Sequence, residues 1–224
     1  MQKKTIYVLA GAAGLLVIAN LYYILFKLGD EVNQGAVYRI MFFHIPAAIM
    51  DFTMYFVAMI ASIGFLVTKR FSYDSMAVAA VEVGTMFCAL NLITGSIWGR
   101  EAWGGWWYWD ARLTSQLICF LLYAGYLILR PAIEDATQRA TFAAVLAIFS
   151  FADVPIVYFS IQWWRTQHPS PVLTTGGLAP GMALPLWGMM FAFVLLGTAL
   201  LMLRLQQESM SREIDSLRRQ AHAL

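Results

Sequence analysis

The sequence predicts an all-α integral membrane protein built as a bundle of six transmembrane helices, and two observations lead to this fold class. Hydrophobic residues make up 60% of the 224 residues and charged residues only 12%, against roughly 25% charged in a typical soluble domain. The apolar residues also form six long runs, and most of these runs have a length close to that of a membrane-spanning helix, about 20 residues. The runs are Tyr7–Phe26, Ile45–Val67, Met76–Ile97, Ser115–Leu129, Ala140–Trp163 and Ala183–Leu203.

The first three runs differ in the signals that flank them. Lys3 and Lys4 precede the first run as in a signal peptide, but the run is too long for a signal-peptide core, so we expect a retained helix. The second run follows the segment RIMFFHIPAAIMD, in which His44 stands just before Pro46, and a proline there suits the first turn of a helix. The short polar segment TKRFSYDS separates the second run from the third.

The last three runs complete the predicted bundle. The fourth run is the shortest, and Pro131 follows it, where a proline ends a helix or starts the next segment. The fifth run contains Pro155, which should kink its helix because proline removes a helix hydrogen bond. The sixth run continues from Arg204 into a charged tail with apolar residues at helical spacing. We therefore expect a transmembrane domain at 1–204 and a cytoplasmic helical tail at 205–224.

The distribution of Lys and Arg predicts the orientation of the bundle. With the N-terminus inside, ten of the 15 basic residues lie in inner segments and five in outer segments, so both termini are expected in the cytoplasm. The basic residues form no stripe that follows a nucleic acid backbone, so no nucleic acid partner is expected. Cys88 and Cys119 form no CxxC or CxxCH pattern, which argues against a thioredoxin-like reductase and a c-type cytochrome.

Two of the three histidines fall on the predicted outer side. His44 lies in the first outer segment and His168 in the third, whereas His222 falls inside. The tryptophan-rich segment, residues 98–115, forms the second outer segment and lies between the two histidines in sequence. The topology, assigned from basic residues alone, therefore brings two imidazoles and an aromatic segment to one membrane surface.

The tryptophan-rich segment reads WGREAWGGWWYWDARLTS and is unlike an ordinary aromatic belt. Belt residues are spread over helix ends, whereas the tryptophans crowd here around glycines, which let a backbone approach a ligand closely. Its tryptophans are Trp98, Trp103, Trp106, Trp107 and Trp109. Asp110, which follows them, is suited either to cap the fourth helix or to contact a partner.

A flat aromatic ligand explains the tryptophan-rich segment and the histidine pair together. Haem offers a macrocycle for stacking, an iron with two axial positions for imidazole, and two propionates that Arg100 or Arg112 can bind. Zinc, held by the two histidines and a carboxylate in an outer-face membrane metalloenzyme, is an alternative that gives the tryptophans no role. A haem-based electron carrier is the other alternative, although such proteins hold haem deeper inside the spans.

Three carboxylates lie within or near the apolar runs, where an ionised group is costly and often functional. Asp51 and Asp153 lie towards the outer side and are suited to support the histidines. Glu82 lies towards the inner side and suggests a path by which haem enters the bundle. Hydrogen bonding between helices is the alternative for all three.

The tryptophan-rich segment closely resembles the signature of the CcmC/CcmF/CcsA haem-handling (WWD) family of cytochrome c maturation. FFHIPAAIMD and VYFSIQWWRTQH resemble the histidine-bearing segments that flank this signature in the family. The resemblance covers essentially the whole chain, and the six spans match the small branch of the family. It implies that His44 and His168 are axial ligands of haem iron, and that the tryptophans and Asp110 form the haem platform.

The resemblance also implies the cargo and the partners. Family members present haem b at the periplasmic face of the bacterial inner membrane and pass it to the haem chaperone CcmE, which supplies apocytochromes c. The small membrane protein CcmD and an ABC transporter formed by CcmA and CcmB accompany them, with membrane lipid around the bundle. Because the chaperone forms the covalent bond to haem, a transfer component is implied rather than an enzyme, and a lyase-like role in loading the chaperone stays open.

Overall fold

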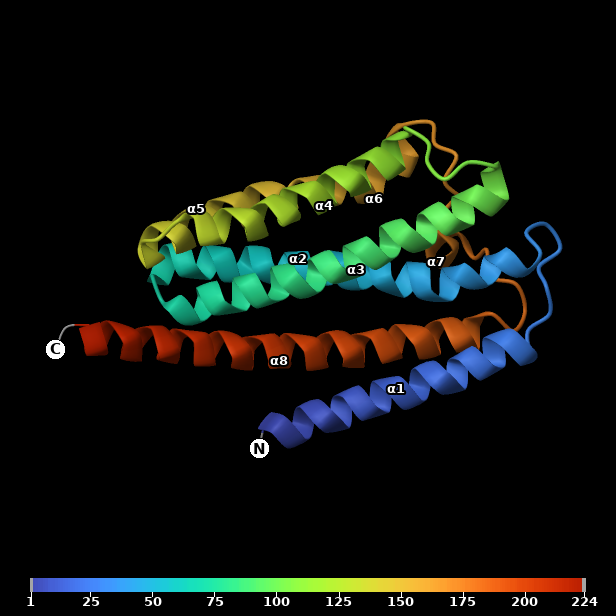
Figure 1. The fold of residues 1–224 in the computed structure, drawn as a ribbon. Helices are drawn as coiled ribbons and strands as arrows, with labels where there is room; N and C mark the ends of the chain where they lie inside the picture. Colours follow the sequence, from blue (N-terminus) through green and yellow to red (C-terminus); the bar gives the residue numbers. More distant parts are fainter. Residues whose placement is uncertain (1, 223–224) are drawn as a thin grey trace.

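The computed structural model describes residues 2–222 and consists of helices and the segments that join them (Figure 1). Six helical segments are long and apolar enough to cross a membrane, which confirms the predicted six-span, all-α membrane fold. The spans are α1 (Gln2–Phe26), α2 (Met41–Thr68), α3 (Phe71–Trp103), α4 (Ala111–Leu129), α5 (Ala136–Phe151) followed by α6 (Asp153–Trp163), and α8 (Ala183–His222). Three short helices lie in the connections: η1 (Ala36–Ile40), η2 (Arg130–Ala132) and α7 (Val172–Thr175). Residues 223 and 224 of the predicted tail lie outside the described residues.

The helices form three groups across the bundle (Figure 1). α2 and α3 pack against each other in the middle, with α4, α5 and α6 on one side and α1 and α8 on the other. The start of α1 and the end of α8 both point towards the left of Figure 1. The segments that link α1 to α2, α3 to α4 and α6 to α8 gather at the opposite end, which we call the loop end.

Two helix boundaries at the loop end differ from the sequence-based expectation. α2 already begins at Met41, so Pro46 lies inside the helix and not in its first turn. α3 extends to Trp103 and ends where Gly104 adopts a left-handed conformation with φ of 82°, which glycine tolerates best. The non-helical part of the tryptophan-rich segment is therefore residues 104–110, a shorter loop than expected.

The fifth span is interrupted, as Pro155 predicts. α5 ends at Phe151, α6 begins at Asp153, and Pro155 stands in the first turn of α6. In a continuous helix the ring of a proline clashes with the carbonyl four residues earlier. That residue is Phe151, so the observed end of α5 follows from the position of the proline.

Charged side chains connect α3, η2 and α8 near the end of the bundle that carries the termini. Asp74 is 4% exposed and accepts from Arg130 Nη1 at 2.7 Å and from Arg212 Nη2 at 2.5 Å. Glu82 of α3 forms an ion pair with Arg204 of α8. Each pair supplies the partner that a charge needs when it leaves water, so Glu82 takes part in the helix–helix bonding that was the alternative to a haem path.

The middle of the bundle is packed around two stacked tyrosines. The rings of Tyr55 in α2 and Tyr123 in α4 lie 3.6 Å apart between centroids, with planes 4° apart, and both are fully buried. Gly84 of α3 lies against this pair, because a Cβ at this position would come within 2.8 Å of the Tyr55 ring. The missing side chain therefore lets α3 approach α2 closely.

Gly84→Ala is expected to lower the melting temperature of the purified protein in detergent, although alanine favours a helix by about 1 kcal/mol. The added methyl must displace a ring held by its stacking partner, and such overpacking costs roughly 1–3 kcal/mol. Gly125→Ala in α4 is the matched control, because nothing lies within 4 Å of a Cβ there. Equal melting temperatures for the two variants, measured by tryptophan fluorescence, would contradict this packing.

Candidate functional site

The structure brings His44 and His168 together at the loop end. His44 lies near the start of α2, and His168 lies in the non-helical segment between α6 and α7. Their ring centroids are 6.2 Å apart and their planes are 32° apart. Two imidazoles that bind one metal ion from opposite sides have ring centres about 6 Å apart, because each metal–nitrogen bond is about 2 Å long and each nitrogen lies about 1 Å from its ring centre. The observed separation therefore suits a metal between the two rings.

The His44 ring is partly buried against α3. Its Nδ1 lies 3.1 Å from Oγ1 of Thr94. Asn91 Nδ2 donates to the backbone carbonyl of His44 at 3.1 Å. Gly95 stands beside the ring, because a Cβ on it would lie 3.1 Å from Cε1 of His44. One turn of α3 thus holds both the ring and the backbone of this histidine.

The His168 ring interacts with its own chain segment. Its Nδ1 lies 2.8 Å from the carbonyl oxygen of Pro169, and its backbone N–H donates to Oγ1 of Thr166 at 3.1 Å. Burial and then the positive charge of Arg112 lower the pKa of His168 to about 4. The imidazole is therefore neutral at pH 7, the form in which histidine binds metals.

Asp110 connects the tryptophan-rich segment to the segment that carries His168. Its Oδ1 accepts from the backbone N–H of Leu113 at 2.9 Å and so caps the start of α4. Its Oδ2 accepts from Thr166 Oγ1 at 2.6 Å and from the backbone N–H of Gln167 at 3.1 Å. The capping interpretation of Asp110 is thus confirmed, and the link to residues 166–167 is a contact that the sequence did not reveal.

Four of the five tryptophans pack in two aromatic groups, and Trp106 belongs to neither. Trp98 and Trp103 meet edge to face at 4.9 Å between centroids, and Tyr108 packs on Trp103 at 5.8 Å. Trp107 meets Trp109 edge to face at 5.8 Å. Trp106 and Trp109 are 61% and 77% exposed. These contacts build an aromatic surface beside α3 and α4, and its contact with a ligand stays a prediction.

The two candidate arginines have different surroundings. Arg112, in the first turn of α4, donates through Nη1 to the carbonyl of Val157 in α6, and its charge acts on both His44 and His168. Arg100 is exposed and donates to the carbonyl of Gly104 at 2.7 Å, where it helps to close the end of α3. Arg112 is therefore the arginine that accompanies the histidine pair.

Asp51 and Asp153 are not bonded to the histidines. Oδ2 of Asp51, a fully buried residue, accepts from Gln116 Nε2 at 3.0 Å, and its Oδ1 has no hydrogen-bond partner among the described residues. The same Gln116 nitrogen lies 3.0 Å from Sγ of Cys88. Asp153 likewise keeps one carboxyl oxygen, Oδ2, without a partner in the described part of the chain. Asp51 thus takes part in an inter-helix polar cluster of α2, α3 and α4.

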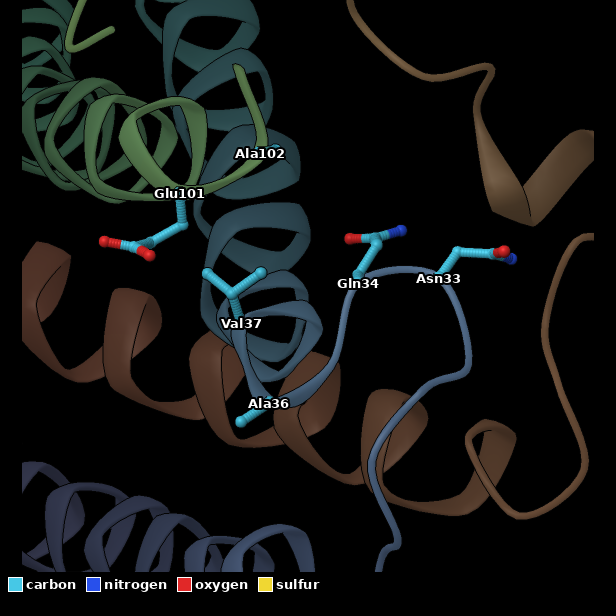
Figure 2. A pocket seen from close by; sticks show the side chains of 6 residues that line it. All are labelled: Asn33, Gln34, Ala36, Val37, Glu101 and Ala102. Carbon is cyan, nitrogen blue, oxygen red and sulfur yellow. The ribbon is translucent and has the colours of Figure 1, made fainter. Parts of the chain in front are cut away.

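A cavity of about 530 Å³ opens at the loop end between the α1–α2 connection and the end of α3 (Figure 2). Figure 2 shows Asn33 and Gln34 on the connection, and Glu101 and Ala102 on α3. Oε1 of Gln34 also accepts from the indole Nε1 of Trp98 at 2.9 Å. This contact connects the α1–α2 connection to the tryptophan-rich segment, although neither histidine lines the cavity.

Comparison with known proteins identifies the family. The model of the family CcmC, Heme exporter protein C, matches residues 1–220. The chain belongs to the Heme exporter protein C family. It is 41% identical to Heme exporter protein C of Bradyrhizobium diazoefficiens over 212 residues, which cover 93% of this chain and 80% of that protein. Identity to the proteins of that name is 36% in Escherichia coli K12 over 178 residues (79% and 72%) and 34% in Paracoccus denitrificans over 218 residues (94% and 88%).

Membership of the CcmC family assigns the chain a role in haem handling for cytochrome c maturation. The six apolar helices make it a multi-pass membrane protein. Both statements agree with the expectations drawn from the sequence, and they give a chemical context for the histidine pair.

Sequence reasoning on this CcmC family member missed the residues that orient the histidines. These are Asn91, Thr94 and Gly95 on α3, and Thr166 beside His168. A signal for the first two exists, because an amide and a hydroxyl three residues apart share one face of a helix that is otherwise apolar. Their partners lie on other segments of the chain, so the signal alone does not say what they bind.

Asp110→Asn is expected to loosen the His168 segment of this CcmC family member while keeping α4 intact. Asparagine caps a helix about as well as aspartate, but one of its side-chain atoms is an NH2 donor, which cannot accept from the N–H of Gln167. Losing a hydrogen bond to a charged group, roughly 1.5–3 kcal/mol, should speed amide exchange about tenfold or more in residues 164–170. Hydrogen exchange followed by mass spectrometry measures it, with Glu101→Gln, an exposed carboxylate at the same end, as control. An unchanged exchange rate in Asp110→Asn would show that the Asp110 link does not restrain the His168 segment.

Proposed function

We propose that this protein binds haem b between His44 and His168 and delivers it to the haem chaperone CcmE for the biogenesis of c-type cytochromes. The observation that carries the proposal is the 6.2 Å separation of the two imidazole rings, which come from segments far apart in the chain. Haem iron bound to four porphyrin nitrogens has two axial positions left, and histidine is a common axial ligand. The haem is cargo, so the site must hold it and also release it.

The surroundings of the pair fit haem better than zinc. Among residues 2–222, no three His, Cys, Asp or Glu side chains group as a metal site, and the two histidines supply fewer protein ligands than a catalytic zinc site commonly uses. The aromatic surface offers stacking for a macrocycle. Arg112 carries the positive charge suited to a propionate. Two imidazole ligands and an aromatic surface at the same end of the bundle are the combination that suits haem.

The exposed part of the site supports transfer to a partner. Trp106 and Trp109 are largely exposed, and aromatic rings of this kind are enriched where proteins bind one another. We assign this edge to CcmE, and we expect CcmD and the transporter subunits CcmA and CcmB to bind elsewhere on the bundle. In this proposal the chain orients haem for the chaperone and needs no catalytic residue of its own.

The same proposal sets the site on the periplasmic side of the bacterial inner membrane. The excess of basic residues in the segments at the other end supports cytoplasmic termini. The transmembrane part then corresponds to residues 1–204, and residues 205–224 extend α8 into the cytoplasm. Haem that reaches the loop end would be presented where c-type cytochromes are assembled.

Alanine variants of the two histidines test the ligand pair. The purified protein is expected to bind haem with the absorption spectrum of low-spin, six-coordinate iron, because two imidazoles fill the axial positions. His44→Ala and His168→Ala should each lose most of the bound haem or convert it to a high-spin spectrum, and added imidazole should restore the low-spin form. In cells, both variants should leave co-expressed CcmE largely without covalent haem.

His222→Ala is the control for these variants, since residue 222 lies at the end of α8, away from the loop end. It should keep haem occupancy and spectrum. An unchanged spectrum in both His44→Ala and His168→Ala would refute the ligand pair.

Cysteine labelling tests the orientation. A cysteine introduced at the exposed Gln167 should react with a membrane-impermeant maleimide in intact spheroplasts, because the segment would face the periplasm. A cysteine at Gln220, exposed near the end of α8, should react only after the membrane is opened. Cys88 and Cys119 are buried and are replaced by alanine in both reporters. The reverse labelling pattern would contradict a periplasmic site.

A further inference from the structure

We propose that the two histidines have unequal roles: His44, fixed by Thr94, stays on the iron, and His168 is the ligand that leaves when haem is passed on. The inference rests on the proposed function, since it takes haem to lie between the two rings. Its basis is the different way in which the structure holds each ring.

Thr94 selects the nitrogen with which His44 binds iron. The Thr94 hydroxyl donates to the carbonyl of Leu90 at 2.7 Å, with the carbonyl of Asn91 as a second acceptor at 3.1 Å. A hydroxyl has one hydrogen, so towards Nδ1 of His44, 3.1 Å away, its oxygen is the acceptor. Nδ1 therefore carries the ring hydrogen, and Nε2 keeps the lone pair that binds a metal.

The position of His44 is fixed as firmly as its tautomer. Asn91 Nδ2 donates to the backbone carbonyl of His44 at 3.1 Å, and it lies 3.5 Å from both ring nitrogens, too far for a strong hydrogen bond to either. Gly95 leaves the ring in contact with bare α3 backbone. Asn91, Thr94 and Gly95 share one face of α3, and α2 and α3 form the most extensive helix pair of the bundle. Moving this ring requires moving that pair.

His168 is held by a segment that can move with it. The hydrogen-bond partner of its Nδ1 is the carbonyl of the next residue, Pro169. A carbonyl only accepts, so here too Nε2 is left for iron. Residues 164–171 lie between α6 and α7, and the Asp110 carboxylate fastens them through Thr166 and Gln167. The ring and its partner travel together, so withdrawal from the iron costs no hydrogen bond at Nδ1.

Release then has a defined order. The bond between iron and Nε2 of His168 breaks, and a side chain of the acceptor protein donates an electron pair to the vacant axial position. One donor pair replaces another, so the iron keeps its oxidation state, and His168 leaves as a neutral imidazole. The bond to His44 breaks last, when the acceptor already holds the haem.

Carbon monoxide binding tests this order, because carbon monoxide enters the axial position that a histidine vacates. The full-length haem-loaded protein is reduced with dithionite in detergent and mixed with carbon monoxide in a stopped-flow instrument. Asp110→Asn, which loosens the His168 segment, should raise the association rate roughly tenfold or more. Thr94→Val and Gly95→Ala, which disturb His44, should each change it by less than about twofold, since the vacated side is that of His168.

The reduction potential gives a second readout for Thr94. Without the hydrogen bond at Nδ1 the imidazole is a weaker donor to ferric iron, so Thr94→Val should shift the potential to a more positive value. Thr94→Ser keeps the hydroxyl and should restore the wild-type potential. An unchanged potential in Thr94→Val would remove the role assigned to the hydroxyl.

The failures of the two proposals are distinguishable. The unequal roles would be overturned if Thr94→Val or Gly95→Ala accelerated carbon monoxide binding as much as Asp110→Asn or more. That result would not contradict ligation by both histidines. Absence of low-spin haem from the wild-type protein, or an unchanged spectrum in His44→Ala and His168→Ala, would overturn the haem site itself.

Discussion

The arrangement of the loop end depends on the two oxygens of one carboxylate. One oxygen of Asp110 caps α4, and the other holds the segment that carries His168. One residue therefore fixes three features: the end of the tryptophan-rich segment, the start of the fourth span and the position of His168. In all the described hydrogen bonds of Asp110, its oxygens are the acceptors. Only a side chain that accepts on both of its terminal atoms can make this set of bonds. The separation between His168 and His44 follows from this link.

Both imidazoles are held in a form that suits metal ligation. Thr94 and the carbonyl of Pro169 set the same tautomer, and the lowered pKa keeps His168 neutral near pH 7. Little side-chain ordering is then needed on binding, which favours affinity. The exposed rings of Trp106 and Trp109 lie in the loop between α3 and α4, at the same end of the bundle. In the proposed function, tight binding at the iron and access at the edge let one site both hold and release haem.

The membrane fold was predictable, because a bilayer imposes length and composition on each span. The meeting of the two histidines was predictable too, because each span carries the chain to the opposite side of the membrane. The contacts that orient the rings were not. Thr94 acts on His44 from another helix, and a sequence pattern does not record which helix faces which. The glycines show a second limit: Gly99 lies inside α3 against the Trp103 ring, whereas Gly104 ends the helix. In sequence both look like loop residues, and only packing separates them.

Arg112 connects the electrostatics of the site with its geometry. Its described hydrogen bond to the carbonyl of Val157 engages Nη1, and a guanidinium has five N–H donors, so donors remain for an anionic group. In the proposed function, a haem propionate would accept from these donors. Arg112 also follows Asp110 by two residues at the start of α4. In the proposed function, the same helix start supplies the positive charge for a haem propionate and the carboxylate that holds the His168 segment, so a movement of α4 would weaken both contacts with haem together.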